Sequence, residues 1–351
     1  MFLISREEAG AILRDYGITA GIRALTELQR YHYEQDDPDS REVRLIVRID
    51  LEAAPPLVIR FKNEEDVTLE LVESQSRFAA ALKNAGIITP RQYLYGGSYA
   101  HWYRIGGYDV IVTLEDFAEN ELRVVDEGIA QKTGALLARM HSIAEQQDLH
   151  VDNDVLFDPF GENDLFAYDD LAQLAETLTG EDRALARRIT ERYESCMAKL
   201  APLKARPGYA VQGDISDCNL YLTADGAVGI FDFNRSGDNI LFCDAVMQAV
   251  FEARLMDYPE DRGEDFEARL LSAFLEGYCA VRPFSAQEQE WAAILCTIID
   301  AFWAFDIRWR EDGLMNAHKA GDAAKVRQWL ETIWKRLDTP RLRGFFDRTL
   351  S

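Results

Sequence analysis

The sequence predicts an α+β fold with two lobes, a small antiparallel-sheet lobe that contains one long helix and a larger, mainly helical lobe. The chain has 351 residues, which is more than one hydrophobic core usually organises. Its first third contains short apolar runs separated by polar or proline-rich breakers, and the later part shows mainly helical periodicity. We therefore predict an N-terminal lobe over residues 1–118 and a C-terminal lobe over residues 119–351.

Capping and turn residues divide the N-terminal lobe into its elements. Ser5 and Glu8 form a capping box, which predicts a first helix that ends near Gly17. Apolar runs predict strands, and an amphipathic stretch that Gly86 ends predicts the long helix. In chain order, we expect strands over residues 24–33, 43–50 and 57–61, the helix over residues 64–84, and strands over residues 92–95 and 108–114.

Helical patterns continue through the C-terminal lobe. We expect a helix over residues 131–142 and two helices, broken at Gly180, over residues 164–200. Residues 285–288 form a second capping box and predict a further helix. His141 lies at the end of the first of these helices. No second His or Cys lies at ligand spacing from it, so we interpret His141 as structural rather than as a base or a metal ligand.

The composition argues against several classes of partner. The net charge of −23 argues against binding to nucleic acid or to anionic membranes, and it fits general solubility better than it fits a cationic substrate. The sequence contains no run of about 18 apolar residues, so we expect neither a signal peptide nor a membrane span. Its five cysteines are scattered and lack Cys-x-x-Cys spacing, which predicts a reducing, cytoplasmic location.

Three oxygen-bearing residues, Asp214, Asn219 and Asp232, surround a predicted hairpin. Two apolar runs are separated by a segment that contains Asp225-Gly226, a strong hairpin signal. A two-residue turn at this dipeptide would place Asn219 opposite Asp232, with their Cβ atoms roughly 5 Å apart. An amide oxygen and a carboxylate at that distance could share a hard cation such as Mg²⁺. A four-residue loop would move Asn219 by about two positions, and this alternative stays open.

This arrangement resembles the catalytic segment of the aminoglycoside phosphotransferase and choline kinase superfamily, the small-molecule relatives of protein kinases. The family pattern is His-Gly-Asp, four residues, Asn, and then Asp-Phe or Asp-Trp after a hairpin. The resemblance implies a protein-kinase-like fold, with Asp214 as catalytic base and with Asn219 and Asp232 holding the Mg²⁺ of MgATP. Gln212 replaces the family His. We interpret this departure as tolerated, because Gln can both donate and accept hydrogen bonds.

The resemblance also implies a cation on the third strand that binds the ATP phosphates and pairs with a Glu on the long helix. Arg60 occupies this place, and Lys62 shares its strand face because side chains at i and i+2 point the same way. Either cation could therefore contact phosphate, and either could instead be an exposed edge-strand residue. Alignment of the helix places Gln75 at the Glu position, which leaves Glu73 or Glu70 as the acidic partner.

The end of the last strand marks the expected hinge between the lobes. The resemblance makes Glu115 to Phe117 this hinge, whose backbone groups would hydrogen-bond adenine. The sequence contains neither a Gly-x-x-x-x-Gly-Lys nor a Gly-x-Gly-x-x-Gly motif. Because protein kinases cover ATP with a glycine-rich loop, its absence favours the small-molecule branch.

An aromatic run near the C-terminus is the candidate acceptor site. On a helix, Phe302, Phe305, Asp306 and Trp309 would share one face. Burying an unpaired carboxylate is costly. Asp306 therefore either pairs with an Arg, such as a neighbour like Arg308 or one from the other lobe, or, together with aromatic faces, binds an amino or quaternary ammonium group of the substrate. We take Asp306 and Trp309 as candidate substrate residues and expect the other aromatic side chains to pack in the core.

Together, these features predict an O-phosphotransferase that uses ATP and Mg²⁺. Its acceptor would be the hydroxyl group of a small metabolite, with or without an amine, or of an aminoglycoside-like compound. Two alternatives remain, a protein Ser/Thr kinase of the same superfamily and a non-catalytic nucleotide-binding module. The sequence identifies neither the acceptor nor the oligomeric state.

Overall fold

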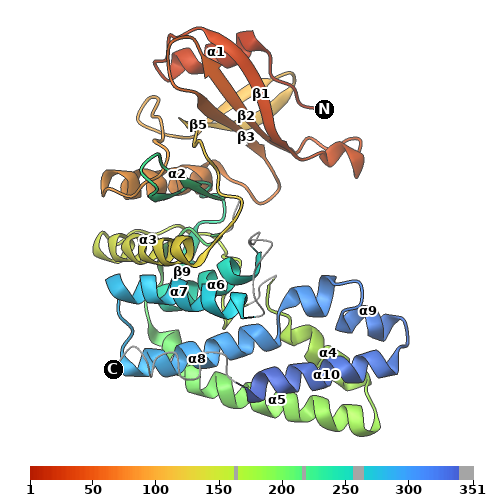
Figure 1. Ribbon diagram of the computed structural model, residues 1–351. Coiled ribbons are helices and arrows are strands. Elements are labelled where there is room, and N and C mark those ends of the chain that lie inside the picture. Colours follow the sequence, from red (N-terminus) through yellow and green to blue (C-terminus); the bar gives the residue numbers. More distant parts are fainter. Residues whose placement is uncertain (162–164, 216–218, 256–264, 340–351) are drawn as a thin grey trace.

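The computed structural model describes residues 1–161, 165–215, 219–255 and 265–339, and it confirms the predicted α+β fold. Figure 1 shows a sheet with helices α1 (Arg6–Asp15) and α2 (Leu69–Asn84) in the N-terminal part, followed by a mainly helical C-terminal part. The predicted capping box of Ser5 and Glu8 is present at the start of α1. None of the helices in these ranges is long and apolar enough to span a membrane.

Five antiparallel strands form the N-terminal sheet in the order β1-β2-β3-β5-β4. Side chains alternate between its faces. Leu45 and Ile59 belong to the core that also contains α1, so the even-numbered side chains of β2 and β3, including Arg60 and Lys62, lie on the opposite face. The strands are β1 (Ile22–Arg30), β2 (Val43–Leu51), β3 (Leu57–Asn63), β4 (His101–Ile105) and β5 (Tyr108–Asp116), and a short 3₁₀ helix, η1 (Tyr33–Gln35), lies between β1 and β2.

Two elements of this part differ from the prediction. Helix α2 begins at Leu69 instead of residue 64, because the Thr68 side chain accepts a hydrogen bond in the first turn and caps the helix there. The fourth strand is His101–Ile105 instead of residues 92–95. The dipeptide Gly106-Gly107 explains this difference. With φ values of 56° and 86°, it forms the tight turn that leads directly from β4 into β5.

The core of the C-terminal part is built on a close contact between α3 and α7. A Cβ atom added to Gly134 of α3 would lie 2.0 Å from the Phe274 carbonyl oxygen of α7, and one added to Gly277 would lie 1.9 Å from the Gln131 carbonyl oxygen. Both glycines are therefore required for this close approach. The helices are α3 (Glu127–Gln146), α4 (Tyr168–Thr177), α5 (Gly180–Leu200), α6 (Leu241–Leu255), α7 (Phe266–Val281), α8 (Ala286–Ala301), α9 (Leu314–Lys319) and α10 (Ala323–Asp338), with a 3₁₀ turn, η2 (Ala201–Ala205), and a π-helical turn, η4 (Phe305–Trp309).

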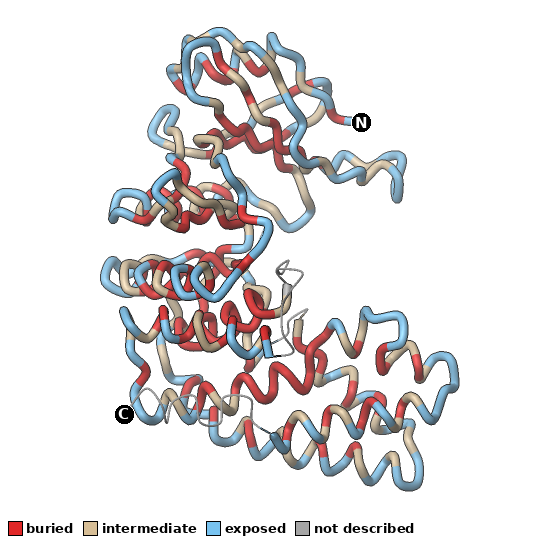
Figure 2. The backbone as a smooth tube through the Cα atoms, in the orientation of Figure 1, coloured by how far each residue is buried: buried red, intermediate tan, exposed pale blue. Residues whose placement is uncertain are grey.

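Two short strand pairs lie between η2 and α6, and the candidate catalytic residues lie in the segments next to these strands. Strand β6 (Tyr209–Val211) pairs with β9 (Gly237–Asn239), and β7 (Leu220–Leu222) pairs with β8 (Val228–Ile230). Figure 2 shows buried residues both in the sheet and along the central helices of the C-terminal part. Ala210, Leu220, Val228 and Ile230 of the strand pairs belong to the core of the C-terminal part.

Candidate active site

The predicted hairpin forms, but its register differs by one residue from the expected one. Phe231, not Asp232, lies next to Asn219 across the hairpin, and the Phe231 N–H donates a hydrogen bond to the Asn219 carbonyl at 2.9 Å. The cause is a three-residue loop, residues 224–226, in which Gly226 has a φ of 77°. The expectation that Asn219 and Asp232 lie directly opposite each other is therefore wrong.

Asp232 adopts an unusual backbone conformation just after this hairpin. Its φ is 58°, in the left-handed region that non-glycine residues rarely adopt and that is often found at functional sites. Gln212 supports this conformation. Its Nε2 donates to the Asp232 carbonyl at 2.7 Å, and its Oε1 accepts from the Asp214 N–H at 2.9 Å. One fully buried amide side chain thus connects Asp214 to Asp232, which supports the interpretation that Gln212 is tolerated in place of His.

Gly213, between Gln212 and Asp214, leaves no room for a side chain. Its φ is 81°, and an added Cβ atom would lie 2.6 Å from the Arg235 carbonyl oxygen. An L-residue with a side chain would therefore be both strained and in steric conflict with the neighbouring chain. The position of Asp214 thus depends on glycine at 213.

A buried chain of polar side chains supports the loop from the helical side. The Ile215 N–H donates to Gln248 Oε1 at 2.8 Å, and Gln248 Nε2 donates to Asp244 Oδ1 at 3.0 Å. The other Asp244 oxygen lies 3.0 Å from His141 Nε2, and His141 Nδ1 lies 2.9 Å from the Tyr278 hydroxyl. His141 is only 1% exposed, so the observed contacts agree with its interpretation as a structural residue.

Asn219 and Asp214 are in direct contact. Asn219 Nδ2 donates to the Asp214 carbonyl at 2.8 Å and to Asp214 Oδ2 at 3.2 Å. Asn219 and Asp232 line the same cleft. Among the described residues, no group of three or more His, Cys, Asp or Glu side chains could hold a metal ion. Mg²⁺ commonly takes one or two carboxylates together with substrate phosphates and water, so this pair fits Mg²⁺ that arrives with a nucleotide.

Arg60 of β3 contacts both Glu115 of the sheet and Asp232, a candidate metal ligand. Its Nε and Nη2 atoms both lie 2.8 Å from Glu115 Oε1, and its Nη1 lies 3.2 Å from Asp232 Oδ2. Burial raises the pKa of Asp232, but the positive charges of Arg60 and Lys62 outweigh this effect and hold that pKa below its usual value. Asp232 is therefore ionised at neutral pH.

Lys62 lies beside Arg60 on the same strand face. Its Nζ donates a hydrogen bond to Asn234 Oδ1, and its side chain is buried. Burial and the nearby charge of Arg60 lower the pKa of Lys62 to about 8. Both candidate cations are therefore buried in the site, and the alternative of an exposed edge-strand cation is wrong.

The two candidates for an acidic partner on α2 lie elsewhere. The Glu73 carboxylate accepts hydrogen bonds from the Tyr99 and Ala100 N–H groups at 2.7 and 2.9 Å, and Glu70 is exposed. Gln75 faces the site instead, because residues two apart on a helix point to opposite sides. Its Nε2 donates to the Asn234 carbonyl at 2.8 Å. The acidic partner of Arg60 is therefore Glu115 on β5, a contact that the sequence analysis missed.

Arg60, Asn219 and Asp232 line a cleft of about 710 Å³, which is a size typical of small-ligand sites. Glu115 and Phe117, the two ends of the predicted hinge, both line it. The Asp116 and Phe117 N–H groups, however, donate to the Arg91 and Pro56 carbonyls. Among the described residues, the Ala118 N–H has no such partner, so it is the N–H group next to the predicted hinge that is available to a ligand.

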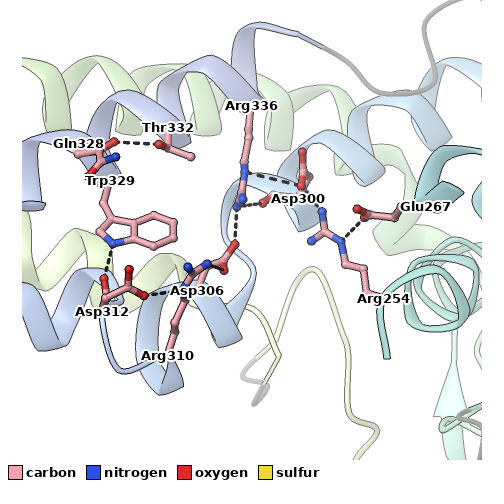
Figure 3. A network of polar contacts seen from close by, with 10 residues as sticks. All are labelled: Arg254, Glu267, Asp300, Asp306, Arg310, Asp312, Gln328, Trp329, Thr332 and Arg336. Carbon is pink, nitrogen blue, oxygen red and sulfur yellow. Dashed lines mark hydrogen bonds and ion pairs between the residues drawn. The ribbon is translucent and has the colours of Figure 1, made fainter. Parts of the chain in front are cut away.

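Asp306 forms ion pairs instead of presenting an unpaired carboxylate. Figure 3 shows it between Arg336, whose Nη1 lies 2.8 Å from Asp306 Oδ2, and Arg310, whose Nη1 lies 3.6 Å from Oδ1. Arg308 pairs with Asp170 instead. Of the two alternatives for Asp306, the structure therefore shows the pairing with arginine.

The aromatic run is not one continuous α-helix, as the prediction assumed. Helix α8 ends at Ala301, and the Ala304 N–H donates to the Leu165 carbonyl, so the backbone leaves the helix before the π-helical turn η4. As a result, Phe302 is buried, whereas Phe305 and Trp309 are 50% and 53% exposed. Trp309 is therefore accessible to a ligand, and Phe305 does not pack in the core as expected.

Comparison with solved structures shows a kinase-like fold. An amicoumacin kinase in complex with AMP-PNP, Ca²⁺ and Ami is 17% identical, with a TM-score of 0.56 over 96% of this chain and 95% of the other. A microcompartment-associated aminopropanol kinase is 14% identical, with a TM-score of 0.53 over 96% and 97%. A putative fructosamine-3-kinase from Thermobifida fusca is 15% identical, with a TM-score of 0.51 over 96% and 100%.

The family model of the phosphotransferase enzyme family matches residues 44–284, which is more than half of the chain. This protein therefore belongs to the phosphotransferase enzyme family, as the resemblance of its catalytic segment implied. A search of curated protein sequences finds no match.

Proposed function

We propose that this protein is an ATP-dependent O-phosphotransferase that acts on the hydroxyl group of a small molecule. The observation that carries the proposal is that Arg60, Asn219 and Asp232 line one cleft while Asp214 contacts Asn219. Phosphoryl transfer needs such a set: a cation for the phosphates, oxygen ligands for a metal ion, and a carboxylate for the attacking hydroxyl. We keep the prediction that the boundary between the two lobes lies near Glu119.

Arg60 would hold the phosphate groups of the nucleotide. Its planar guanidinium can bind two oxygens at once and keeps its charge even when it is buried. Asn219 and Asp232 would hold Mg²⁺, which neutralises charge on the phosphate oxygens when it is bound. The Ala118 N–H would bind the nucleotide base at the hinge, together with backbone carbonyl groups of the same segment.

Asp214 would orient the acceptor hydroxyl and accept its proton. Its N–H is held by Gln212 and its carboxylate is contacted by Asn219, so the loop fixes its position before any acceptor binds. The protein itself forms no covalent intermediate in this proposal. Positioning and charge neutralisation supply the rate acceleration.

Trp309 is the residue that we assign to the acceptor side. Its exposed ring could pack against an acceptor or a cationic group. Asp306 would instead support the turn through Arg336, because its charge is already paired. The kinases of similar fold are named for amicoumacin, aminopropanol and fructosamine, so a first acceptor panel contains amino alcohols, sugar amines and aminoglycosides.

The test compares the wild-type protein with Asp214→Asn. The substitution keeps the size of the side chain and removes the base, so phosphoryl transfer measured by ADP release should fall by about 10²-fold or more. The affinity for MgATP should change by less than about threefold, because Asp214 is not assigned to the nucleotide. Undiminished turnover in Asp214→Asn would refute the assignment.

Two further measurements test the two alternative functions. Incubation with labelled ATP and cell extract would show label on protein if the chain were a protein Ser/Thr kinase. A non-catalytic nucleotide-binding module would bind ATP and release no ADP with any acceptor. The contact between Arg60 and Asp232 favours catalysis over the non-catalytic module, because it brings the phosphate cation and the metal ligand together.

A further inference from the structure

We infer that Glu115 is the positioning residue for Arg60 and that this protein carries its nucleotide-site ion pair within the sheet instead of between the sheet and α2. The inference deepens the proposed function and rests on it. The role predicted from the sequence concerns only the backbone of Glu115, in the hinge, and not its side chain. Glu115 would act through Arg60 rather than by touching the nucleotide.

The sheet register explains why these two side chains meet. Arg60 of β3 lies opposite Thr113 of β5, so Glu115 is its diagonal neighbour on the same sheet face. Diagonal pairs are within reach when one side chain is long. Two guanidinium nitrogens of Arg60 lie 2.8 Å from the same carboxylate oxygen. The pair is therefore held by charge-assisted hydrogen bonds in a fixed geometry.

Glu115 is itself fixed on its other side. Gln92 Nε2 donates to Glu115 Oε2 at 2.6 Å, and both Arg60 and Glu115 are only 7% exposed. Water therefore competes little for either group, and the ion pair keeps its orientation. The remaining Arg60 nitrogen, Nη1, faces Asp232 across the cleft, where nucleotide phosphates and a metal ion would bind.

Helix α2 offers no acid for this role and has a different contact. Gln75 uses its amide N–H groups on the carbonyl oxygens of Asn234, at 2.8 Å, and Ser236, at 3.4 Å. A carboxylate at position 75 would face two carbonyl oxygens and would be repelled by them. Helix α2 thus holds the segment after Asp232 by uncharged hydrogen bonds, while Glu115 supplies the negative charge for Arg60.

The test measures the dissociation constant of MgATP by calorimetry for Glu115→Gln and for the matched control Glu73→Gln. Loss of the charged partner frees Arg60 to change its orientation, so Glu115→Gln should weaken MgATP binding about tenfold. Glu73→Gln removes an acid of α2 that bonds the Tyr99 and Ala100 N–H groups, and it should leave the dissociation constant within about twofold. The opposite order of effects would overturn the inference.

A double-mutant cycle then shows whether Glu115 acts through Arg60. In an Arg60→Ala background, Glu115→Gln should cause no further loss of affinity, because the residue that it positions is absent. Additive losses would overturn the inference. If Glu115→Gln does not fold, as judged by circular dichroism, Glu115→Asp replaces it. The shorter Asp side chain places its carboxylate farther from Arg60, so this variant should still weaken MgATP binding several-fold.

The outcomes separate this inference from the proposed function. Wild-type protein that fails to bind MgATP would refute the proposed function. Wild-type protein that binds MgATP and turns over, together with a Glu115→Gln variant of equal affinity, would refute only the role of Glu115.

Discussion

The two sides of the cleft are held by different kinds of polar contact. On the helical side, uncharged amide groups of Gln212 and Gln248 hold the loop that carries Asp214. On the sheet side, the carboxylates of Glu115 and Asp232 hold Arg60. Uncharged hydrogen bonds keep their geometry whatever the charge of the ligand, so the loop is a fixed frame. On the sheet side, we expect the buried Arg60–Glu115 pair to stay in place and the Arg60–Asp232 contact, which faces the cleft, to be exchanged for a phosphate contact.

The largest effect on stability and turnover is expected at Gly213, where the loop leaves no space for a side chain. Gly213→Ala would place a Cβ atom 2.6 Å from the Arg235 carbonyl oxygen at a φ of 81°. We expect the free energy of unfolding to fall by about 3 kcal/mol and turnover to be lost. Urea denaturation and ADP release measure these changes.

Gly226→Ala is the matched control for Gly213→Ala. Its φ of 77° is similar, but no atom lies within 4 Å of an added Cβ. It should therefore cost only the backbone strain, about 1 kcal/mol, and should keep most of the activity. Equal losses in the two variants would show that strain alone, and not the fixed loop, determines the effect.

Removal of the connecting amide tests the frame directly. Gln212→Ala leaves the Asp214 N–H and the Asp232 carbonyl without their partner, which should cost about 2 kcal/mol of stability and at least about tenfold in turnover. Gln212→His, which introduces the family residue, should retain most of both. Thermal unfolding and ADP release provide the measurement, and an unaffected Gln212→Ala variant would contradict the role of this side chain.

A buried acid in the helical part extends the comparison to pH. Glu252 is fully buried, and Thr133 is the polar side chain that acts on its carboxyl group. Burial raises the pKa of Glu252 well above its usual value. The folded state therefore keeps a proton that the unfolded state releases above its ordinary pKa of about 4.3, so stability falls as pH rises from that value.

Glu252→Gln stays uncharged at every pH and should remove this part of the pH dependence. At pH 8 the variant should be more stable than the wild type by about 1 kcal/mol or more, and at pH 4 the two should agree closely. Urea denaturation between pH 4 and pH 8 makes the measurement. Parallel stability profiles for both proteins would show that Glu252 is ionised or well partnered in the fold.

The smallest effect is expected at Asp306. Asp306→Asn removes the charge that pairs with Arg336 and Arg310. The free energy of unfolding should fall by about 1 kcal/mol or less, and turnover should change by less than about threefold.

Trp309→Ala should instead raise the KM for the acceptor, because this exposed ring is the one assigned to it. Steady-state kinetics with the best acceptor of the panel compares them, and a larger acceptor KM effect in Asp306→Asn would reverse the assignment.

Local signals predicted most of the fold and the loop of the site. Capping boxes, turn residues and strand periodicity depend on neighbours in sequence, so they predicted α1, the first three strands and the hairpin near Asp225. The spacing of Asp214, Asn219 and Asp232 predicted the family, which the family model confirms. The one-residue error in the hairpin arose because Asp-Gly is compatible with loops of two or three residues.

Contacts between distant elements could not be predicted in the same way. The partner of Arg60 depends on the β3–β5 register, and no local pattern distinguishes Glu115 from Glu73 as that partner. Glu115 follows the apolar run of β5, and this position was the only sequence signal for it. Its role as the partner of Arg60 follows only from its place in the sheet. The break before η4 likewise depends on a contact with Leu165. Tertiary contacts thus decided the parts that the sequence left open.

The most direct test of the account is calorimetric titration of ATP into the wild-type protein and into Asp232→Asn, each with Mg²⁺ and with a chelator. The account predicts that Mg²⁺ tightens ATP binding to the wild type by at least about tenfold and that Asp232→Asn removes most of this gain. Equal affinities with and without Mg²⁺ in the wild type would contradict the claim that this cleft binds a nucleotide–metal complex for phosphoryl transfer.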